Sequence, residues 1–255
     1  MRRFIAVLFL GLCTVAAAQA GQGTRRVLFI GNSITYVNDL PNAFASLAPE
    51  GTRLEVDMIA SGGASLADAV RDPLIAYTLA KGGYTDVILQ ERGGDAFCPA
   101  SCQQKSGFGL PAMQSAKELA RMARAGGARV FYLGTWQWDR EANRALEFGE
   151  RAIAKASQAT YIQIAEPRRR LMLAHPGEAW THADGQHPGY ATTAMMVLRI
   201  WGALFDVTPT AVPCVAGEVH YRAPRPNGVL HIDPSLTPRT CLVPAGIVPE
   251  LAGGI

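Results

Sequence analysis

The sequence lacks the runs of like charge that mark proteins binding nucleic acids. Its 255 residues carry 24 Lys and Arg against 21 Asp and Glu, a net charge of +3. The densest basic run is the three arginines at 168–170, shorter than the five or six residues that mark an interaction tail. Three arginines are typical of a solvated helix face, so we expect no nucleic acid partner.

Long apolar runs are also missing, apart from one at the N-terminus. Residues 4–18 are apolar except for Thr14, follow two arginines and lead into an Ala-Gln-Ala segment ending at Ala20. This order is typical of a secretory signal peptide. A membrane anchor is the weaker alternative, because a run of about 15 residues falls short of the roughly 20 that span a bilayer.

We therefore expect residues 1–20 to be removed after Ala20 and the mature chain to be exported, either secreted or periplasmic. A lipoprotein signal at Cys13 is less favoured, because the bulky Leu12 stands where a small residue is usual. No later stretch is long and apolar enough to span a bilayer. Removal of two arginines leaves a mature charge of 22 minus 21, or +1.

Cysteine is scarce, and one of the five would leave with the signal peptide. The other four are Cys98, Cys102, Cys214 and Cys241. An even number in an oxidising compartment predicts two disulfides. Of the three connectivities we favour 98–102 and 214–241, because each pair brackets a loop-like segment. A metal or redox site at 98–102 is disfavoured, since the spacing is not C-x-x-C.

The rest of the sequence alternates between short apolar runs and longer helical patterns. The predicted strands are 26–30, 53–59, 85–89, 128–133 and 160–164. The main predicted helices are 41–48, 66–79, 111–125, 139–157 and 190–205. Strands separated by helices predict βαβ units, and hence a parallel sheet with helices on both faces. We expect one doubly wound α/β domain over residues 21–205, built on five strands.

Residues 206–255 differ from this domain. They hold eight of the sixteen prolines and show no helical period. We interpret them as an extended tail packed on the domain and tied by the 214–241 disulfide. His220 and His231 lie in this tail without partners at metal-ligand spacing, so we expect them to be surface or structural residues.

A serine stands where ligands bind in such a fold. In open α/β sheets that place is beyond the carboxyl ends of the strands. Ser33, in Gly-Asn-Ser-Ile-Thr at 31–35, directly follows the first strand. A sharp turn there would lift the serine to the sheet edge, beside a helix N-terminus that favours developing negative charge. Ser33 is a candidate nucleophile, with a cap or turn serine as the alternative.

A base and its partner lie in a late loop. Asp184 and His187 are three residues apart before the last helix. On a tight turn the carboxylate can hold one imidazole nitrogen and leave the other to face a serine. Alternatively Asp184 caps a turn and His187 is a surface residue. A zinc site that adds His182 is disfavoured, because three ligands from one short loop would crowd the ion.

Donors for an oxyanion can be assigned at two further strand ends. Gly63, at the turn after the second strand, can present its amide to a substrate, and Gln90 ends the third strand. Its carboxamide could point into the same crevice, and the amide of Ser33 would be a third donor. The alternatives are a turn glycine and a strand-end polar residue bonded to nearby backbone.

Together these segments resemble the SGNH hydrolases, the GDSL-like esterases and lipases. Ser33 matches the nucleophile of the family's G-D-S-type first block, with Asn32 where Asp is usual. Asp184 and His187 match the D-x-x-H of its last block. The resemblance covers about residues 26–204 and implies a flavodoxin-like three-layer α/β/α fold.

The middle blocks match less closely. Gly63 fits the second-block glycine best, with Gly62 as the other possibility. The family usually has G-x-N-D in its third block, where the Asn side chain is a donor. This chain has Leu-Gln-Glu-Arg-Gly-Gly at 89–94. Gln90 would substitute for that Asn, although one extra methylene moves its amide.

The resemblance implies a serine esterase that works through an acyl-enzyme and needs no metal or organic cofactor. The implied substrate is a small-molecule or carbohydrate ester with a short acyl group, such as an O-acetyl sugar. Asn32, Trp136 and Trp138 stand at the expected ligand edge. The tryptophans could stack on a sugar ring, or they could pack under a loop or the tail.

Two other functions remain open. A non-catalytic module could hold a glycan in the same crevice, because one fold hosts many functions. Acyl transfer to an acceptor other than water would use the same serine.

Overall fold

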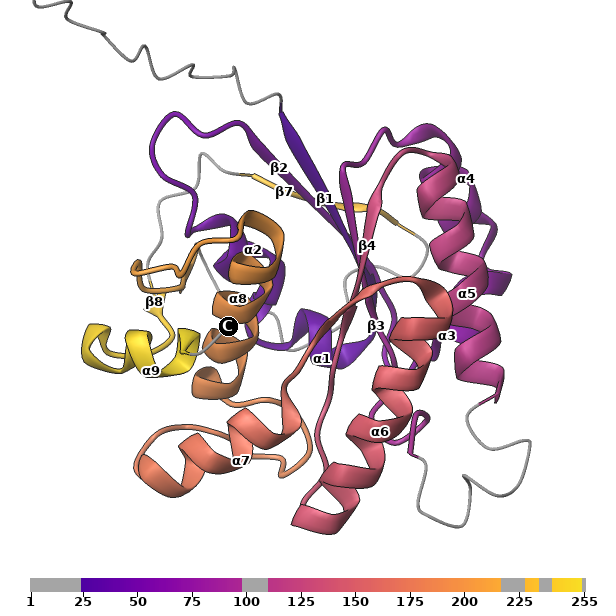
Figure 1. The fold of residues 1–255 in the computed structure, drawn as a ribbon. Helices are drawn as coiled ribbons and strands as arrows, with labels where there is room; N and C mark the ends of the chain where they lie inside the picture. The colour runs from indigo at the N-terminus through magenta and orange to yellow at the C-terminus, as the bar shows by residue number, and fades with distance from the viewer. Residues whose placement is uncertain (1–23, 98–109, 217–227, 234–239, 254–255) are drawn as a thin grey trace, which may run out of the picture.

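The computed structural model of the protein describes residues 24–97, 110–216, 228–233 and 240–253 (Figure 1). The predicted signal peptide, the predicted Cys98–Cys102 bridge and His220 lie outside these residues. Within them, no helix combines the length and apolar character that a membrane span requires.

A six-stranded sheet with the order β5-β4-β3-β1-β2-β7 forms the centre of the molecule (Figure 1). Five strands run parallel to one another and confirm the five predicted ones to within about two residues at each end. They are β1 (Arg25–Gly31), β2 (Leu54–Ala60), β3 (Asp86–Gln90), β4 (Arg129–Leu133) and β5 (Thr160–Ile162). All of β3 is buried, as expected for a central parallel strand covered on both faces.

The sixth strand comes from the tail, and the prediction of a five-stranded sheet did not include it. β7 (Leu230–Ile232) pairs antiparallel with β2, with Ile232 opposite Val56. The tail also contains β6 (Cys214–Val215), β8 (Thr240–Cys241), η2 (Ala245–Ile247) and the helix α9 (Val248–Ala252). Elements this short do not show a hydrophobic period in the sequence.

Helices cover both faces of the sheet, which confirms the predicted three-layer arrangement (Figure 1). One face packs against α2 (Leu40–Ala45), α7 (Ala165–Ala174) and α8 (Tyr190–Phe205), and α9 packs on α8. The other packs against α3 (Leu66–Arg71), α4 (Pro73–Lys81), α5 (Leu110–Ala125) and α6 (Arg140–Ser157). Successive residues of β1 enter opposite cores, because strand side chains alternate between faces.

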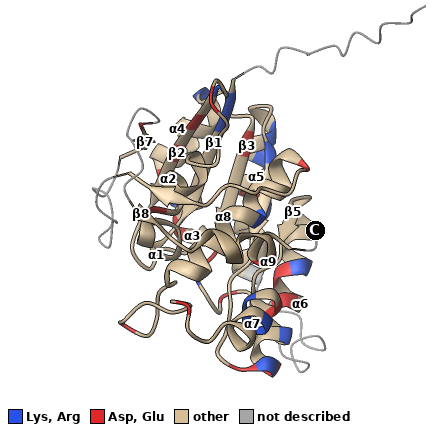
Figure 2. Ribbon diagram, turned by 90° about the vertical axis from the view of Figure 1, so that its left-hand side faces the viewer, with Lys and Arg blue, Asp and Glu red and all other residues tan. Residues whose placement is uncertain are grey.

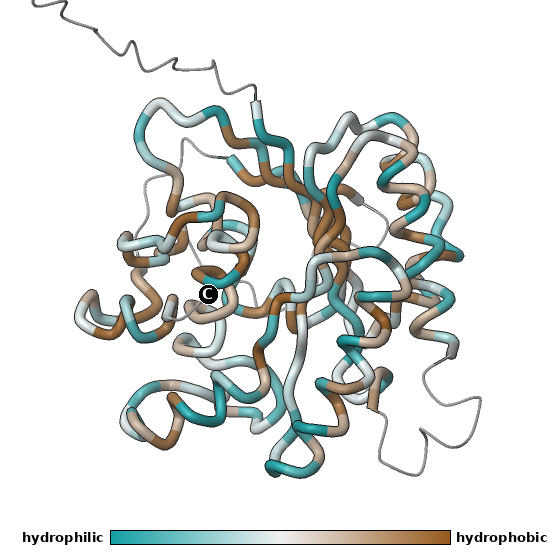
Figure 3. The backbone as a smooth tube through the Cα atoms, viewed as in Figure 1, coloured by the Kyte–Doolittle hydropathy of each residue, from teal (hydrophilic) through white to brown (hydrophobic). Residues whose placement is uncertain are grey.

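Hydropathy follows these layers. Hydrophobic residues are concentrated in the central strands (Figure 3). Charged residues of both signs lie along α6 and α7 (Figure 2). This distribution is that of helices with one apolar face toward the sheet and one polar face toward solvent.

The helix predicted over 66–79 is divided in two. Pro73 follows Asp72, whose carboxylate accepts a hydrogen bond from the Leu74 amide at 2.8 Å and so caps α4. Proline lacks the amide hydrogen that would continue α3, and it fits the first turn of a new helix. The predicted Asp139 cap of α6 is confirmed, since its carboxylate accepts from the Ala142 amide at 2.8 Å.

The Cys214–Cys241 disulfide is confirmed. It joins β6 to β8, where the two residues lie directly opposite each other. The Cys214 amide also donates to the Ser46 hydroxyl at 2.9 Å, just after α2. The bridge therefore joins two parts of the tail beside the end of α2.

Candidate active site

Ser33 begins α1 (Ser33–Tyr36) directly after β1, at the carboxyl edge of the sheet. Asn32 caps this short helix, because its side-chain oxygen accepts from the Ile34 amide at 3.1 Å. The preceding Gly31 is required by close packing. A Cβ there would lie 2.3 Å from Thr35 Oγ1 and 2.7 Å from Gln90 Oε1. The sharp turn expected before the serine is thus present, and Ser33 is half-buried at its apex.

Gln90 holds this turn from the end of β3. Its Oε1 accepts from the Asn32 amide at 3.1 Å and from Thr35 Oγ1 at 2.8 Å. Its Nε2 donates to the backbone oxygen of Glu91, and the residue is only 1% exposed. The carboxamide is therefore engaged in the wall of the site. Its role as an oxyanion donor stays a prediction.

The second turn carries Gly63 after β2. Its φ of +69° lies in the left-handed region, which glycine adopts without steric cost. The Asn32 side chain donates to the backbone oxygen of Ala64 at 2.9 Å, so the first and second turns are joined. Gly63 is exposed at this edge, and its predicted role as an amide donor remains a prediction.

Glu91 also holds the second turn, a role that was not predicted from the sequence. Its carboxylate accepts from the Leu66 amide at 3.1 Å, at the start of α3, and from the Arg92 amide at 2.7 Å. Burial raises the pKa of Glu91 to about 7. The two backbone hydrogen bonds act in the opposite direction and lower it. An acid directly after a buried strand was the available sequence signal.

The late loop brings Asp184 and His187 into contact. Asp184 Oδ2 lies 2.6 Å from His187 Nδ1, and Asp184 Oδ1 accepts from the amides of Gln186 at 2.9 Å and His187 at 3.1 Å. The carboxylate thus shapes the turn and holds the ring. When Nδ1 carries the hydrogen, Nε2 is left as the basic nitrogen.

Asn38 ties this loop beside the first turn. It lies in η1 (Val37–Asp39), which follows α1. Its side-chain amide donates to the backbone oxygen of Pro188 at 2.8 Å and to Thr193 Oγ1 at 3.0 Å. Asn38 is five residues after Ser33, and Pro188 directly follows His187. Their hydrogen bond therefore places both segments at the same edge of the molecule.

Arg168 anchors the other end of the loop. It is 2% exposed and donates to the backbone oxygen of Trp180 at 3.0 Å, to Thr181 Oγ1 at 2.9 Å and to Thr192 Oγ1 at 2.9 Å. The basic run at 168–170, predicted as a solvated helix face, therefore includes one buried structural arginine. A long-range partner of this kind leaves no mark in the local sequence.

His182 supports the turn from within the loop. Its Nδ1 accepts from the Asp184 amide at 3.3 Å, and its own amide donates to the His187 backbone oxygen at 2.9 Å. Over the ranges that the structure covers, no three His, Cys, Asp or Glu side chains are grouped to hold a metal ion.

The two tryptophans after β4 lie in different environments. Trp136 is 8% exposed in the core, with the Arg168 guanidinium 4.8 Å from its ring centre. Trp138 is 64% exposed. Of the pair proposed to stack on a sugar, only Trp138 presents most of its ring to solvent.

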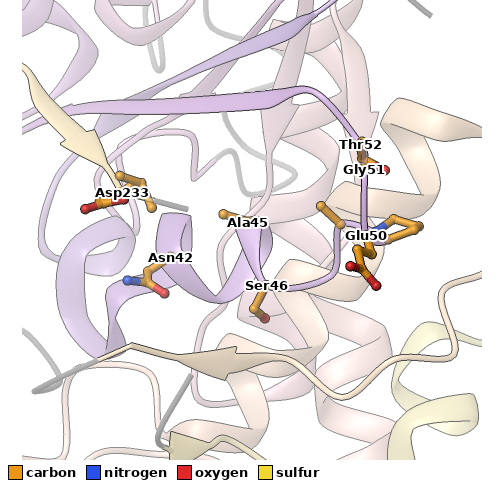
Figure 4. A pocket seen from close by; sticks show the side chains of 10 residues that line it. Asn42, Ala45, Ser46, Glu50, Gly51, Thr52 and Asp233 are labelled. Atoms are coloured by element: carbon orange, nitrogen blue, oxygen red, sulfur yellow. The ribbon is translucent and has the colours of Figure 1, made fainter. Parts of the chain in front are cut away.

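A cavity of about 310 Å³ lies elsewhere, at the amino edge of the sheet. Figure 4 shows its lining, which includes Asn42, Ser46, Glu50 and Asp233. None of the predicted catalytic residues lines it.

Comparison with known proteins rests on structure. No family model matches the chain, and no curated protein matches it. Among solved structures, TesA is 21% identical, with a TM-score of 0.51 over 71% of this chain and 99% of TesA. A catalytic mutant of Axe2, an acetylxylan esterase from Geobacillus stearothermophilus, is 11% identical, with a TM-score of 0.56 over 74% and 98% of the two chains. The chain has the SGNH hydrolase fold.

A third neighbour with this fold is a DUF4886 family protein from Bacteroides uniformis. It is 14% identical, with a TM-score of 0.55 over 74% of this chain and 87% of that protein. In this SGNH hydrolase fold, the first, second and third sheet-edge segments are joined through Asn32, Gln90 and Glu91. Asn38 adds the last segment to them.

Proposed function

We propose that the protein is an exported serine esterase acting on short-chain esters, such as the O-acetyl groups of carbohydrates. The observation that carries the proposal is the 2.6 Å contact between Asp184 and His187, in a loop that Asn38 ties to the segment following Ser33. The acetylxylan esterase among the structural neighbours supports the substrate class. The N-terminal sequence pattern supports export.

In the proposed reaction, Ser33 Oγ attacks the ester carbonyl while His187 Nε2 takes the serine proton. Asp184 keeps the ring oriented and stabilises the imidazolium. The amides of Ser33 and Gly63 stabilise the oxyanion of the tetrahedral intermediate, and the sequence prediction adds Gln90 to them. The alcohol leaves with the proton from His187. Water then attacks the acyl-enzyme in the same way and releases the acid.

The decisive experiment compares the mature chain with two serine variants. We expect the wild type to release acetate from a nitrophenyl acetate and from acetylated xylan, and to be labelled by a fluorophosphonate. Ser33→Ala should not be labelled, and its turnover should fall about 10⁴-fold or more. Its circular dichroism spectrum should be unchanged. Ser61→Ala, an exposed serine at the same edge, is the matched control and should retain activity.

Three outcomes would reject the proposal. Turnover retained by Ser33→Ala would place the chemistry on another residue. A wild type that binds acetylated oligosaccharides without turnover or labelling would instead favour the glycan-binding module. Transfer of acetyl to an added sugar in preference to water would identify an acyltransferase that uses the same serine.

A further inference from the structure

We propose that the Tyr36 hydroxyl is the side-chain donor of the oxyanion hole, in the role that the SGNH pattern gives to the third-block Asn. This inference rests on the proposed esterase function. It assigns a catalytic role to a residue that lies outside the segments matched to the SGNH pattern above.

The position of Tyr36 follows from its spacing. Ser33 and Tyr36 are the first and last residues of α1, and residues three apart on a helix share a face. Tyr36 is 7% exposed, and its phenol lies near enough to the Ser33 side chain for the serine to lower the phenol pKa. The phenol and Ser33 therefore lie on the same side of this turn.

The second turn approaches the same hydroxyl. A Cβ built on Gly62 would lie 3.1 Å from the Tyr36 oxygen. The Tyr36 hydroxyl is thus next to both Ser33 and the Gly62-Gly63 turn. An oxyanion bound by the amides of Ser33 and Gly63 would form in this space, within reach of a third donor.

The side chain predicted for that role is already engaged. Gln90 Nε2 donates to the Glu91 backbone oxygen, and Gln90 Oε1 accepts from Asn32 and Thr35. Oε1 must be the atom that faces the Asn32 amide, because that amide can only donate. Turning the carboxamide toward substrate would therefore break the hydrogen bonds that hold the nucleophile turn.

Tyr36 keeps its proton at neutral pH. Burial raises the pKa of its phenol above the ordinary value of 10, and the neighbouring Ser33 side chain acts in the opposite direction. The hydroxyl is therefore a neutral donor. A charged phenolate would repel the developing oxyanion.

In the attack step, the bond from Ser33 Oγ to the carbonyl carbon forms as the carbonyl π pair moves to oxygen. His187 takes the serine proton. Tyr36 donates a hydrogen bond to the new oxyanion and transfers no proton. When the carbonyl re-forms, the bond to the alcohol oxygen breaks and His187 protonates the leaving group. The Tyr36 interaction is strongest at the intermediate, so it lowers the barrier more than it strengthens substrate binding.

The test uses Tyr36→Phe, which removes one oxygen. We expect kcat for acetyl ester hydrolysis to fall about 10²-fold to 10³-fold, with KM within about threefold of the wild type. Affinity for a trifluoromethyl ketone, which forms an oxyanion on Ser33, should fall by a similar factor. Tyr77→Phe is the matched control, since Tyr77 is 58% exposed on α4, and it should change neither quantity.

A second variant, with 3-fluorotyrosine at position 36, distinguishes hydrogen-bond donation by the hydroxyl from a purely structural role. It keeps the hydroxyl but makes it more acidic. We expect near wild-type kcat at neutral pH and a loss of kcat as alkaline pH ionises the fluorophenol, a loss absent when 3-fluorotyrosine replaces Tyr77. This variant also decides the question if Tyr36→Phe has a lowered melting temperature.

An active wild type with a fully active Tyr36→Phe would overturn the inference alone. So would a pH profile unchanged by fluorination at position 36. A wild type without turnover and without fluorophosphonate labelling would reject the proposed function, and this inference with it.

Discussion

The two ends of β3 bury a carboxylate in opposite ways. Asp86, at the amino end, is fully buried, and Arg25 lies 3.2 Å and Arg129 2.6 Å from its oxygens. Glu91, just past the carboxyl end, is 2% exposed and is held by the backbone amides of Leu66 and Arg92. One acid is paired with full positive charges, and the other with neutral donors.

This difference separates an edge held by charged groups from the edge that carries the candidate site. At the amino edge, Arg25 and Arg129 also donate to the Leu204 backbone oxygen, which ties the sheet to the end of α8. At the carboxyl edge, Gln90 and Glu91 use neutral hydrogen bonds to position turns. At the amino edge, charged groups tie the sheet to α8, whereas at the carboxyl edge neutral hydrogen bonds hold the polar turns.

The largest expected effect compares the two histidines of the late loop. His187→Ala should reduce kcat/KM for an acetyl ester about 10⁴-fold, because Ser33 loses its base. His182→Ala should stay within about tenfold, since His182 contacts the turn through Asp184. Steady-state kinetics of both variants decides. An equal loss in the two would mean that the pair acts together, as in a metal site.

The second effect concerns the disulfide of the tail. The double variant Cys214→Ser and Cys241→Ser should lose about 3.5 kcal/mol of unfolding free energy, because the bridge closes a separation of 27 residues. Ester hydrolysis by the folded fraction should be unchanged. Urea denaturation measures the loss. The same double change at Cys98 and Cys102 is the control, and we expect a smaller loss because the predicted loop is shorter. Lost activity without lost stability would contradict the division between the edges.

A third effect tests the ion pairs directly. Asp86→Asn should lower the free energy of unfolding by about 2–3 kcal/mol, because it leaves two partly exposed arginines without their shared carboxylate. Glu55→Gln, which breaks the more exposed Arg26 pair, should cost less than about 1 kcal/mol. Chemical denaturation of both variants gives the comparison. Equal losses of unfolding free energy in the two variants would show that the buried ion pairs of Asp86 stabilise the fold no more than an exposed pair does.

The last comparison concerns a pH dependence at the carboxyl edge. Glu150 is buried, and burial raises its pKa from 4.5 to about 7, against hydrogen bonds from Tyr161 and Thr135. The folded state then holds the proton more tightly than the unfolded one. The free energy of unfolding should fall as pH rises from about 4.5 to 7.

Glu150→Gln keeps the oxygen that accepts from Thr135 and removes this titration. The variant should therefore reduce the fall in unfolding free energy between pH 4.5 and 7 by up to about 3 kcal/mol. Denaturation at pH 4.5, 6 and 7.5 measures the slope, with the exposed Glu118→Gln as control. A slope unchanged by Glu150→Gln would assign the pH dependence elsewhere.

Much of this molecule followed from local patterns. The five parallel strands, the helix over 190–205 and the Asp139 cap were all predicted, because the apolar runs and capping residues that specify them are adjacent in sequence. The split at Pro73 was missed, although proline was its local signal. The strand β7 was missed because its three residues pair only with a strand about 170 positions away.

The sequence by itself determined which residues carry the candidate chemistry, since Ser33, Asp184 and His187 stand in recognisable segments at strand and helix ends. Only the tertiary structure decided what surrounds them. Gln90 proved to hold the turn that carries Ser33, Asn38 to join the late loop to it, and the Tyr36 hydroxyl to lie beside Gly62. The physical reason is that a hydrogen bond depends on distances and angles between atoms, and segments far apart in the chain acquire these only when the sheet brings them to a common edge.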